Sequence, residues 1–129
     1  MIIDQGNPAF LRLQSAYGAA VNSGFTDTGF TGSTFAIDPV TLAKFGWLNT
    51  LLGLSGLASG ANIYWGNAPY TVNGLLDING NIVPMTFAQF QALLVRLGNY
   101  SASLDAKLAS LSGQILAATT QAAADAISW

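Results

Sequence analysis

The chain has 129 residues, which fits one domain with a real core, and its formal net charge at pH 7 is −2. It contains no cysteine and no histidine, which excludes disulfides, thiolate zinc sites, cysteine nucleophiles, and the commonest general base and metal ligand. Its four scattered basic residues cannot neutralise a track of phosphates, which argues against nucleic-acid binding.

Charged residues make up only 8% of the chain, against about 25% in an ordinary globular domain. The mean hydropathy is positive, yet the most apolar segment, residues 45–65, is interrupted by Asn, Ser and Gly and falls short of a membrane span. The acidic Asp4 and the lack of an apolar run after it argue against a signal peptide. A neutral polar surface keeps a free monomer poorly soluble, so we expect an assembly subunit, with a free monomer as the alternative.

Two helices are predicted in the N-terminal part. Apolar residues at helical spacing predict the first helix over residues 8–22. A loop rich in Gly and Thr then leads to a short strand over residues 34–37. Asp38 and Pro39 mark the start of the second helix, as N-cap and first helical residue, and this helix extends to about Leu54.

The segment after the second helix is rich in aromatic residues. Residues 62–74 (NIYWGNAPYTVNG) are typical of a strand, a turn and a second strand. Tyr64, Trp65 and Tyr70 in this segment, together with Trp129 at the C-terminus, form a candidate aromatic contact surface. Such residues stack on a sugar or peptide ligand, or belong to a core or a protein interface.

The stretch LLDINGNIVPM contains the strongest hairpin signal of the chain. Asn79-Gly80 is typical of a two-residue turn in which both residues have positive φ. Asp77, Asn79 and Asn81 also alternate as the ligands of a calcium loop do. However, Gly80 is fourth rather than sixth after the start of that pattern, and the chain contains no Glu for the twelfth position. We therefore interpret Asn79 and Gly80 as a structural turn and predict no metal site.

The longest periodic segment predicts a helix over residues 86–118. Thr86 and Gln89 fit a capping box at its start. Its apolar residues recur at alternating steps of three and four, which is the repeat of a coiled coil or a long bundle helix. Gly98 and Gly113 weaken it, so one interpretation is a helix bent or broken there and packed within its own monomer. We favour the other, in which an apolar seam is buried against another subunit. The candidate interface residues of this seam are Leu97, Leu104, Leu108, Leu111 and Ile115.

No combination of residues indicates catalysis. Paired carboxylates suited to glycoside hydrolysis are missing. Ser103 and Lys107 lie one helical turn apart, as helices often place residues by chance, and Asp105 lies off that face. The segment GLSGLASG lacks the Lys-Ser/Thr ending of a phosphate-binding loop. We therefore expect no enzyme, with no catalytic, cofactor-binding or metal-binding residue.

Together these elements predict a single α+β domain over residues 1–129. It has N-terminal helices, a small antiparallel β-hairpin and a long C-terminal helix over residues 86–118 that we expect to mediate oligomerisation. Thr119 or Thr120 is expected to cap one last short helix.

The order of these motifs resembles one family, a domain of unknown function in bacteriophage and prophage genes. Its members occur near the C-termini of tail and tail-fibre proteins or beside fibre-assembly genes. The resemblance covers about residues 10–129, and the family carries no catalytic residue to transfer. The residues that carry it are Gly24-Phe25-Thr26, Phe35, Asp38, Trp65, Asp77, Gly80, Thr86, Gln89 and Trp129 after an Ala-rich tail.

The resemblance implies a bacteriophage virion structural protein of the tail or tail-fibre apparatus, made in the host cytoplasm and located in the virion. Its expected partners are other virion proteins and copies of itself, with a trimer as the usual symmetry of fibres. The family domain often follows a longer fibre or chaperone region, whereas here it forms nearly the whole chain. This difference favours a stand-alone virion subunit or a small assembly factor. The alternatives are a tail-fibre assembly chaperone and a carbohydrate-binding module that uses Trp65 and its neighbours.

Overall fold

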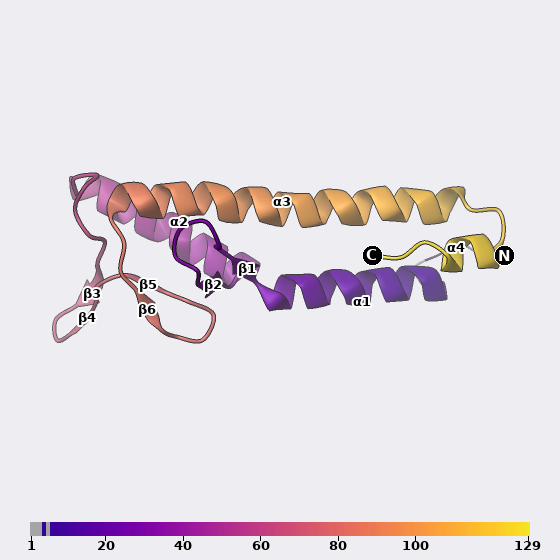
Figure 1. Cartoon of the computed structure of the whole chain (residues 1–129), viewed down its shortest axis with the longest axis horizontal. Coiled ribbons are helices and arrows are strands. Elements are labelled where there is room, and N and C mark those ends of the chain that lie inside the picture. The colour runs from indigo at the N-terminus through magenta and orange to yellow at the C-terminus, as the bar shows by residue number, and fades with distance from the viewer. Residues whose placement is uncertain (1–3, 5) are drawn as a thin grey trace. The chain divides into compact units, whose positions relative to one another are not determined.

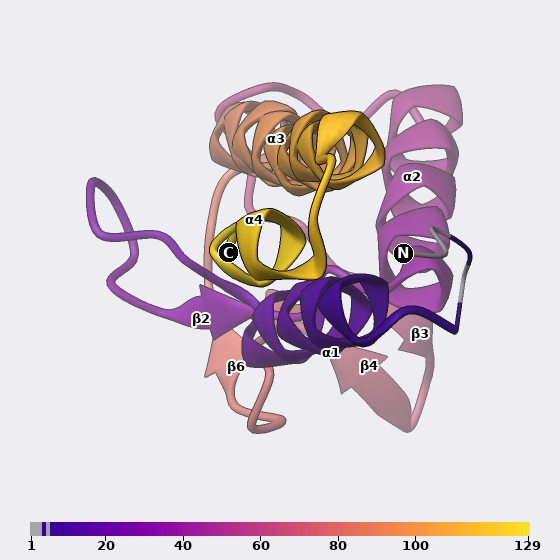
Figure 2. The same ribbon diagram turned by 90° about the vertical axis from the view of Figure 1, so that its right-hand side faces the viewer.

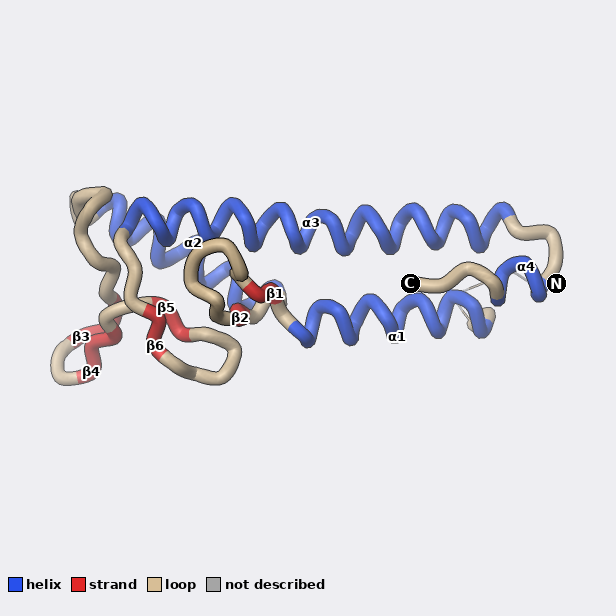
Figure 3. The backbone as a smooth tube through the Cα atoms, viewed as in Figure 1, coloured by secondary structure: helices blue, strands red, loops and turns tan. Residues whose placement is uncertain are grey.

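The structure is a computed structural model that describes residue 4 and residues 6–129, and it confirms the α+β class. This part of the chain holds four helices and three antiparallel sheets of two strands each (Figures 1 and 3). The helices are α1 (Pro8–Ser23), α2 (Pro39–Leu54), α3 (Phe87–Ala117) and α4 (Gln121–Asp125). The strands are β1 (Phe25–Thr26), β2 (Thr34–Phe35), β3 (Trp65–Asn67), β4 (Tyr70–Val72), β5 (Leu75–Leu76) and β6 (Ile82–Val83).

No helix in the described residues is both long enough and apolar enough to cross a membrane. Residues 1–3 and 5, which belong to the segment from which we expect no signal peptide, lie outside the described residues.

Both predicted N-terminal helices are confirmed, and α2 starts with the predicted cap. The Asp38 carboxylate accepts hydrogen bonds from the Thr41 amide at 2.9 Å and from the Thr41 hydroxyl at 2.6 Å. The bond from the hydroxyl is the main reason that the pKa of Asp38 lies below its ordinary value. Pro39 follows as the first helical residue, where its missing N–H leaves no hydrogen bond unmade.

The long helix α3 is also confirmed, with its capping box. The Thr86 amide donates to the Gln89 side-chain oxygen at 2.9 Å, and the Gln89 amide donates to the Thr86 hydroxyl at 3.2 Å. The helix continues through Gly98 and Gly113 without a break, so the broken form is not observed. Of the two expected caps for the last helix, Thr120 caps α4 by accepting a hydrogen bond from the Ala123 amide.

The turn at Asn79-Gly80 differs from the prediction. Only Gly80 has positive φ, at 81°, and no residue other than glycine has positive φ in the described part of the chain. The Asp77 amide donates to the Asn81 carbonyl, and the Gly80 amide donates to the Asp77 carbonyl, so the loop has one residue more than predicted. The reason is Ile78, whose amide donates to the Thr34 carbonyl at 2.8 Å and is therefore not available to the β5–β6 ladder.

Two further hairpins accompany this one. β3 pairs with β4 as the sequence predicts, with Trp65 opposite Val72. β1 pairs with β2, with Phe25 opposite Phe35, where the sequence predicts a loop before a single strand. Of the predicted strand over residues 34–37, only Thr34 and Phe35 form a strand.

The described residues divide into two compact units, where the sequence predicts one domain. Unit 1 combines the described residues up to Ser23 with Ser101–Trp129, and unit 2 is Gly24–Tyr100. In unit 1, α1 and α4 pack side by side (Figure 2). An ion pair of 2.6 Å between Arg12 and Asp125 links these two helices at the surface.

Each unit has its own apolar core. In unit 1, the main core cluster is built on Ala9, Leu13, Ile115 and Ala124, with Phe10, Leu108, Leu111, Ala118, Ile127 and Trp129 packed around them. In unit 2, α2 and the first part of α3 pack with the strands. The most deeply buried side chains there are Phe35, Ile63, Leu75, Phe90, Leu93 and Leu97.

The prediction that the α3 seam is an intersubunit surface is wrong for three of its residues. Leu97 and Ile115 are 0% exposed and Leu104 is 7% exposed, so they have no surface left to bury against a partner. Leu108 and Leu111 are partly buried and pack against the core of unit 1. The seam is covered by its own chain, because residues of unit 2 pack on its first part, and α1 and α4 pack near its end.

Candidate functional site

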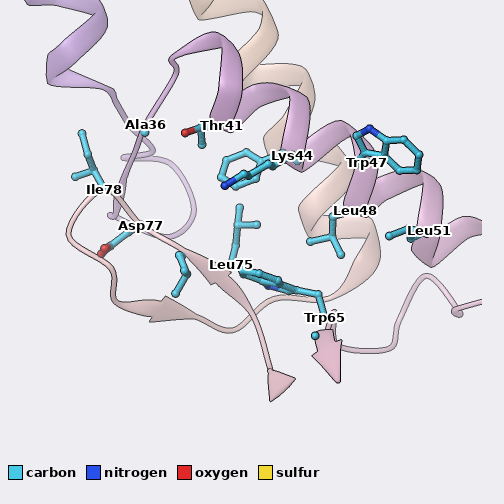
Figure 4. A pocket seen from close by; sticks show the side chains of 13 residues that line it. Ala36, Thr41, Lys44, Trp47, Leu48, Leu51, Trp65, Leu75, Asp77 and Ile78 are labelled. Carbon is cyan, nitrogen blue, oxygen red and sulfur yellow. The ribbon is translucent and has the colours of Figure 1, made fainter. Parts of the chain in front are cut away.

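A groove of about 600 Å³ lies in unit 2, between α2 and the hairpins β3–β4 and β5–β6 (Figure 4). We call it the α2 groove. Lys44 and Leu51 of α2 lie on one side of it, and Trp65, Leu75 and Ile78 lie on the other. Its volume falls within the range of pockets that bind a small molecule or an anchoring side chain of another protein.

One wall of the groove is formed by α2, which carries apolar residues on two of its faces. Phe45 and Leu48 belong to the inner face and are buried in unit 2. On the opposite side Trp47 is 67% exposed, Leu51 is 54% exposed and Leu54 is 81% exposed. A helix that is apolar all round is typical of a completely buried position, whereas the exposed side of α2 is left uncovered by residue 4 and residues 6–129. We call Val40, Lys44, Trp47, Leu51 and Leu54 the outer face of α2.

The opposite wall holds Trp65 in a fixed orientation. The Trp65 indole nitrogen donates to the Gly74 carbonyl at 2.8 Å. The next residue, Gly66, has a φ of 90°, and a Cβ there would overlap the Tyr70 carbonyl oxygen. Glycine therefore allows β4 to approach β3 closely at this point, and the tight hairpin keeps the Trp65 ring in the groove.

The polar groups of the groove are nearly all used within the chain. The Thr41 hydroxyl donates to Asp38, and the Asp77 carboxylate accepts from the amides of Asn79 and Asn81 at 2.9 Å each. Lys44 takes part in no salt bridge with any described residue. The groove therefore offers a contacting molecule mainly apolar surface, with the Lys44 ammonium and the Asp77 carboxylate as its charged groups.

The predicted aromatic contact surface is divided between the two units. Tyr64, Trp65 and Tyr70 belong to unit 2 and are partly or highly exposed, but only Trp65 lines the α2 groove. Trp129 belongs to unit 1, where its ring meets Tyr17 edge-on at 6.1 Å and lies under the Lys107 ammonium at 4.4 Å. Trp129 is therefore a packing residue of unit 1 in this structure.

An ion pair in unit 2 between the buried Asp27 and the partly exposed Arg96 was not predicted from the sequence. Arg96 of α3 donates to both carboxylate oxygens of Asp27, at 2.8 and 3.0 Å, although 69 positions separate the two residues. Burial raises the pKa of Asp27, but the hydrogen bonds from Arg96 and Thr31 outweigh it, so the pKa lies below its ordinary value. Asp27 also holds the β1–β2 loop, because its carbonyl accepts from the Gly32 amide. The pair is structural, since the bonds within the chain use both carboxylate oxygens.

The residues of the predicted structural turn and cap are found in those roles, apart from the longer turn at Asn79-Gly80. No group of three or more Asp, Glu, His or Cys residues that could hold a metal is found in the described range.

The turn at Asp77–Asn81 should be stable without a bound metal ion. Calcium or a chelator should leave the melting temperature unchanged, because the Asp77 oxygens already bind the turn amides. Asp77→Ala should lower the free energy of unfolding by about 1 kcal/mol through loss of those bonds, again without any response to calcium. Asp77→Asn, which keeps one acceptor oxygen, is the control. A wild-type melting temperature several degrees higher in calcium would show that the tip binds the metal.

No protein-family model, no curated protein and no solved structure matches this chain. Its function is therefore inferred from the α2 groove and the outer face of α2.

Proposed function

We propose that this protein is a structural subunit that acts by contact with other protein chains, in the tail or tail-fibre apparatus of a bacteriophage virion. The observation that supports it most is the exposed apolar outer face of α2 beside the α2 groove. Scattered exposed apolar residues are ordinary on protein surfaces, but a contiguous apolar patch marks an interaction site. Trp47 is the largest residue of this patch, and tryptophan is enriched among the residues that dominate binding energy at protein interfaces.

The composition supports a role in an assembly. Only 8% of the residues are charged, so little long-range repulsion keeps copies of the chain apart. The bacteriophage part of the proposal rests on the order of motifs from Gly24-Phe25-Thr26 to Trp129. The homo-oligomer remains part of the proposal, but its contact surface moves from α3 to α2, because the α3 seam is covered within the chain.

The presence of the protein in purified virions tests this function. A phage that encodes it would be purified by density gradient, and its proteins quantified by mass spectrometry against the major tail protein. A structural subunit should be present at a constant ratio to that protein in independent preparations. A tail-fibre assembly chaperone would be abundant in the infected cell and missing from the virions. Absence from the virions would therefore reject the structural role.

The second candidate function is carbohydrate binding, and Tyr70 is the observation in its favour. It lies at the β3–β4 turn and is 85% exposed, so its ring is accessible for stacking on a sugar. The α2 groove favours the candidate less, since sugar hydroxyls need hydrogen-bond partners and the polar groups there are nearly all used. A glycan array with the wild type and Tyr70→Ala tests it. Binding of a defined glycan that Tyr70→Ala abolishes would support this function in place of the first.

A further inference from the structure

The outer face of α2 has the spacing of a helix-pairing surface. Val40, Lys44, Trp47, Leu51 and Leu54 follow one another at steps of four, three, four and three, which is the repeat by which two helices pair along a seam. Its four apolar members are between 54% and 81% exposed. The repeat is the same as that of the α3 seam, but here none of the described residues covers it.

Small residues lie next to this row on the same helix. Ala43, Gly46 and Thr50 line a shallow depression beside Trp47. A Cβ added at Gly46 would meet nothing within 4 Å, so the depression is open to another molecule. A row of large side chains beside a row of small ones is self-complementary, because the ridge of one helix fits the furrow of an identical helix.

We propose that the outer face of α2 binds the outer face of α2 in a second copy of this chain, with the two helices antiparallel about a two-fold axis near Trp47. Trp47 is the midpoint of the row, so each copy places its Trp47 against the small residues of the other. Val40 of each copy then packs near Leu54 of the other. This inference names a partner and a surface for the proposed structural role and rests on it in that respect.

The single charge of the face decides the relative direction of the helices. In a parallel pair the two Lys44 ammonium groups would face each other at the same level and repel. In an antiparallel pair they separate, and each lies beside the C-terminal half of the other α2. The carbonyl end of a helix carries partial negative charge, and α2 has no basic residue in its own last turn. Lys44 of one copy therefore complements the helix end of the other.

Sedimentation of the full chain over a range of concentrations tests the contact. We expect a reversible dimer of the wild type, and we expect Trp47→Asp to raise its dissociation constant by about 30-fold or more, as for a central interface residue. Leu54→Asp should act in the same direction and is the second variant if Trp47→Asp folds poorly. Val95→Asp is the matched control, because Val95 is an apolar residue of unit 2 that is 62% exposed on α3. It should leave dimerisation unchanged, and circular dichroism should show that all the variants are folded.

Disulfide trapping tests the direction of the helices, and the chain contains no cysteine that would interfere. In an oxidised mixture, Val40→Cys and Leu54→Cys should form the mixed dimer, because these two positions meet across an antiparallel contact. Val40→Cys alone should form no disulfide-linked dimer under the same conditions, because the two copies of this position lie at opposite ends of the contact.

Three results would overturn the proposal. They are a wild type that is monomeric at millimolar concentration, a dimer that survives both Trp47→Asp and Leu54→Asp, and rapid self-linking of Val40→Cys, which would indicate parallel helices. None of them bears on whether the protein is present in virions. The α2 contact and the structural role can therefore fail separately.

Discussion

Arg96→Met is expected to lower the free energy of unfolding by about 1–3 kcal/mol, the cost of leaving a buried polar group without its partner. The Asp27 side chain is 2% exposed, and Arg96 provides the only positive charge paired with it in the described residues. Without Arg96 the carboxylate stays buried with only long hydrogen bonds from Thr31, at 3.3 and 3.4 Å. Thermal and urea unfolding at pH 7 measure the loss.

The pH dependence of stability should change sign in this variant. In the wild type the folded pKa of Asp27 is lowered, so its contribution is present above the unfolded pKa, about 3.9, and is lost as pH falls through the folded value. In Arg96→Met we expect burial, the largest single influence on Asp27, to outweigh the long hydrogen bonds from Thr31 and to raise the folded pKa. The contribution of Asp27 is then present below the unfolded value and is lost as pH rises through the folded one. Arg96→Met should therefore approach the wild type in stability at acidic pH.

Arg12→Met is the control for this experiment. It breaks the ion pair with Asp125, in which both side chains are about half exposed, so stability should change little. Equal losses from Arg12→Met and Arg96→Met would show that burial of Asp27 does not determine the strength of its pair.

Leu97→Ala is expected to lower the free energy of unfolding by about 2–5 kcal/mol, because it removes a completely buried side chain and leaves a cavity in unit 2. Self-association of the folded protein should not change, since Leu97 has no surface available to another copy. Leu116→Ala, at an exposed position on the same helix, should change neither property by much. The free energy comes from denaturant unfolding and the association from sedimentation.

The opposite result for Leu97→Ala would restore the original interpretation of α3. If the variant kept its stability but lost an oligomer that the wild type forms, the α3 seam would be an intersubunit surface after all.

The features that were predicted correctly depend on residues close together in the sequence. Asp38 and Thr41, and likewise Thr86 and Gln89, form caps across three positions, so the chain pattern alone specifies the geometry. The ends of α2 and α3 were therefore predicted to within a residue.

The features that were missed depend on what lies beside each element in space. The repeat along α3 identified its apolar side but could not tell a partner chain from α1, α4 and the rest of the same chain. Ile78 lengthens the predicted turn because its amide bonds to Thr34, which is distant in sequence. The pair between Asp27 and Arg96 spans 69 positions and has no local signal. The exposed side of α2 does have a local signal, which is the presence of apolar residues around the whole helix.

The division of the chain has a consequence for the order in which the protein forms during translation. Unit 2 is one continuous segment, so its contacts can close as soon as the ribosome has released Tyr100. α1 is made before unit 2, yet the residues that cover its Ala9 and Leu13 include Ile115 and Ala124, which are made after unit 2. The apolar side of α1 must therefore remain uncovered throughout the synthesis of unit 2. A nascent chain stalled before α4 would carry a finished unit 2 and an α1 available to chaperones.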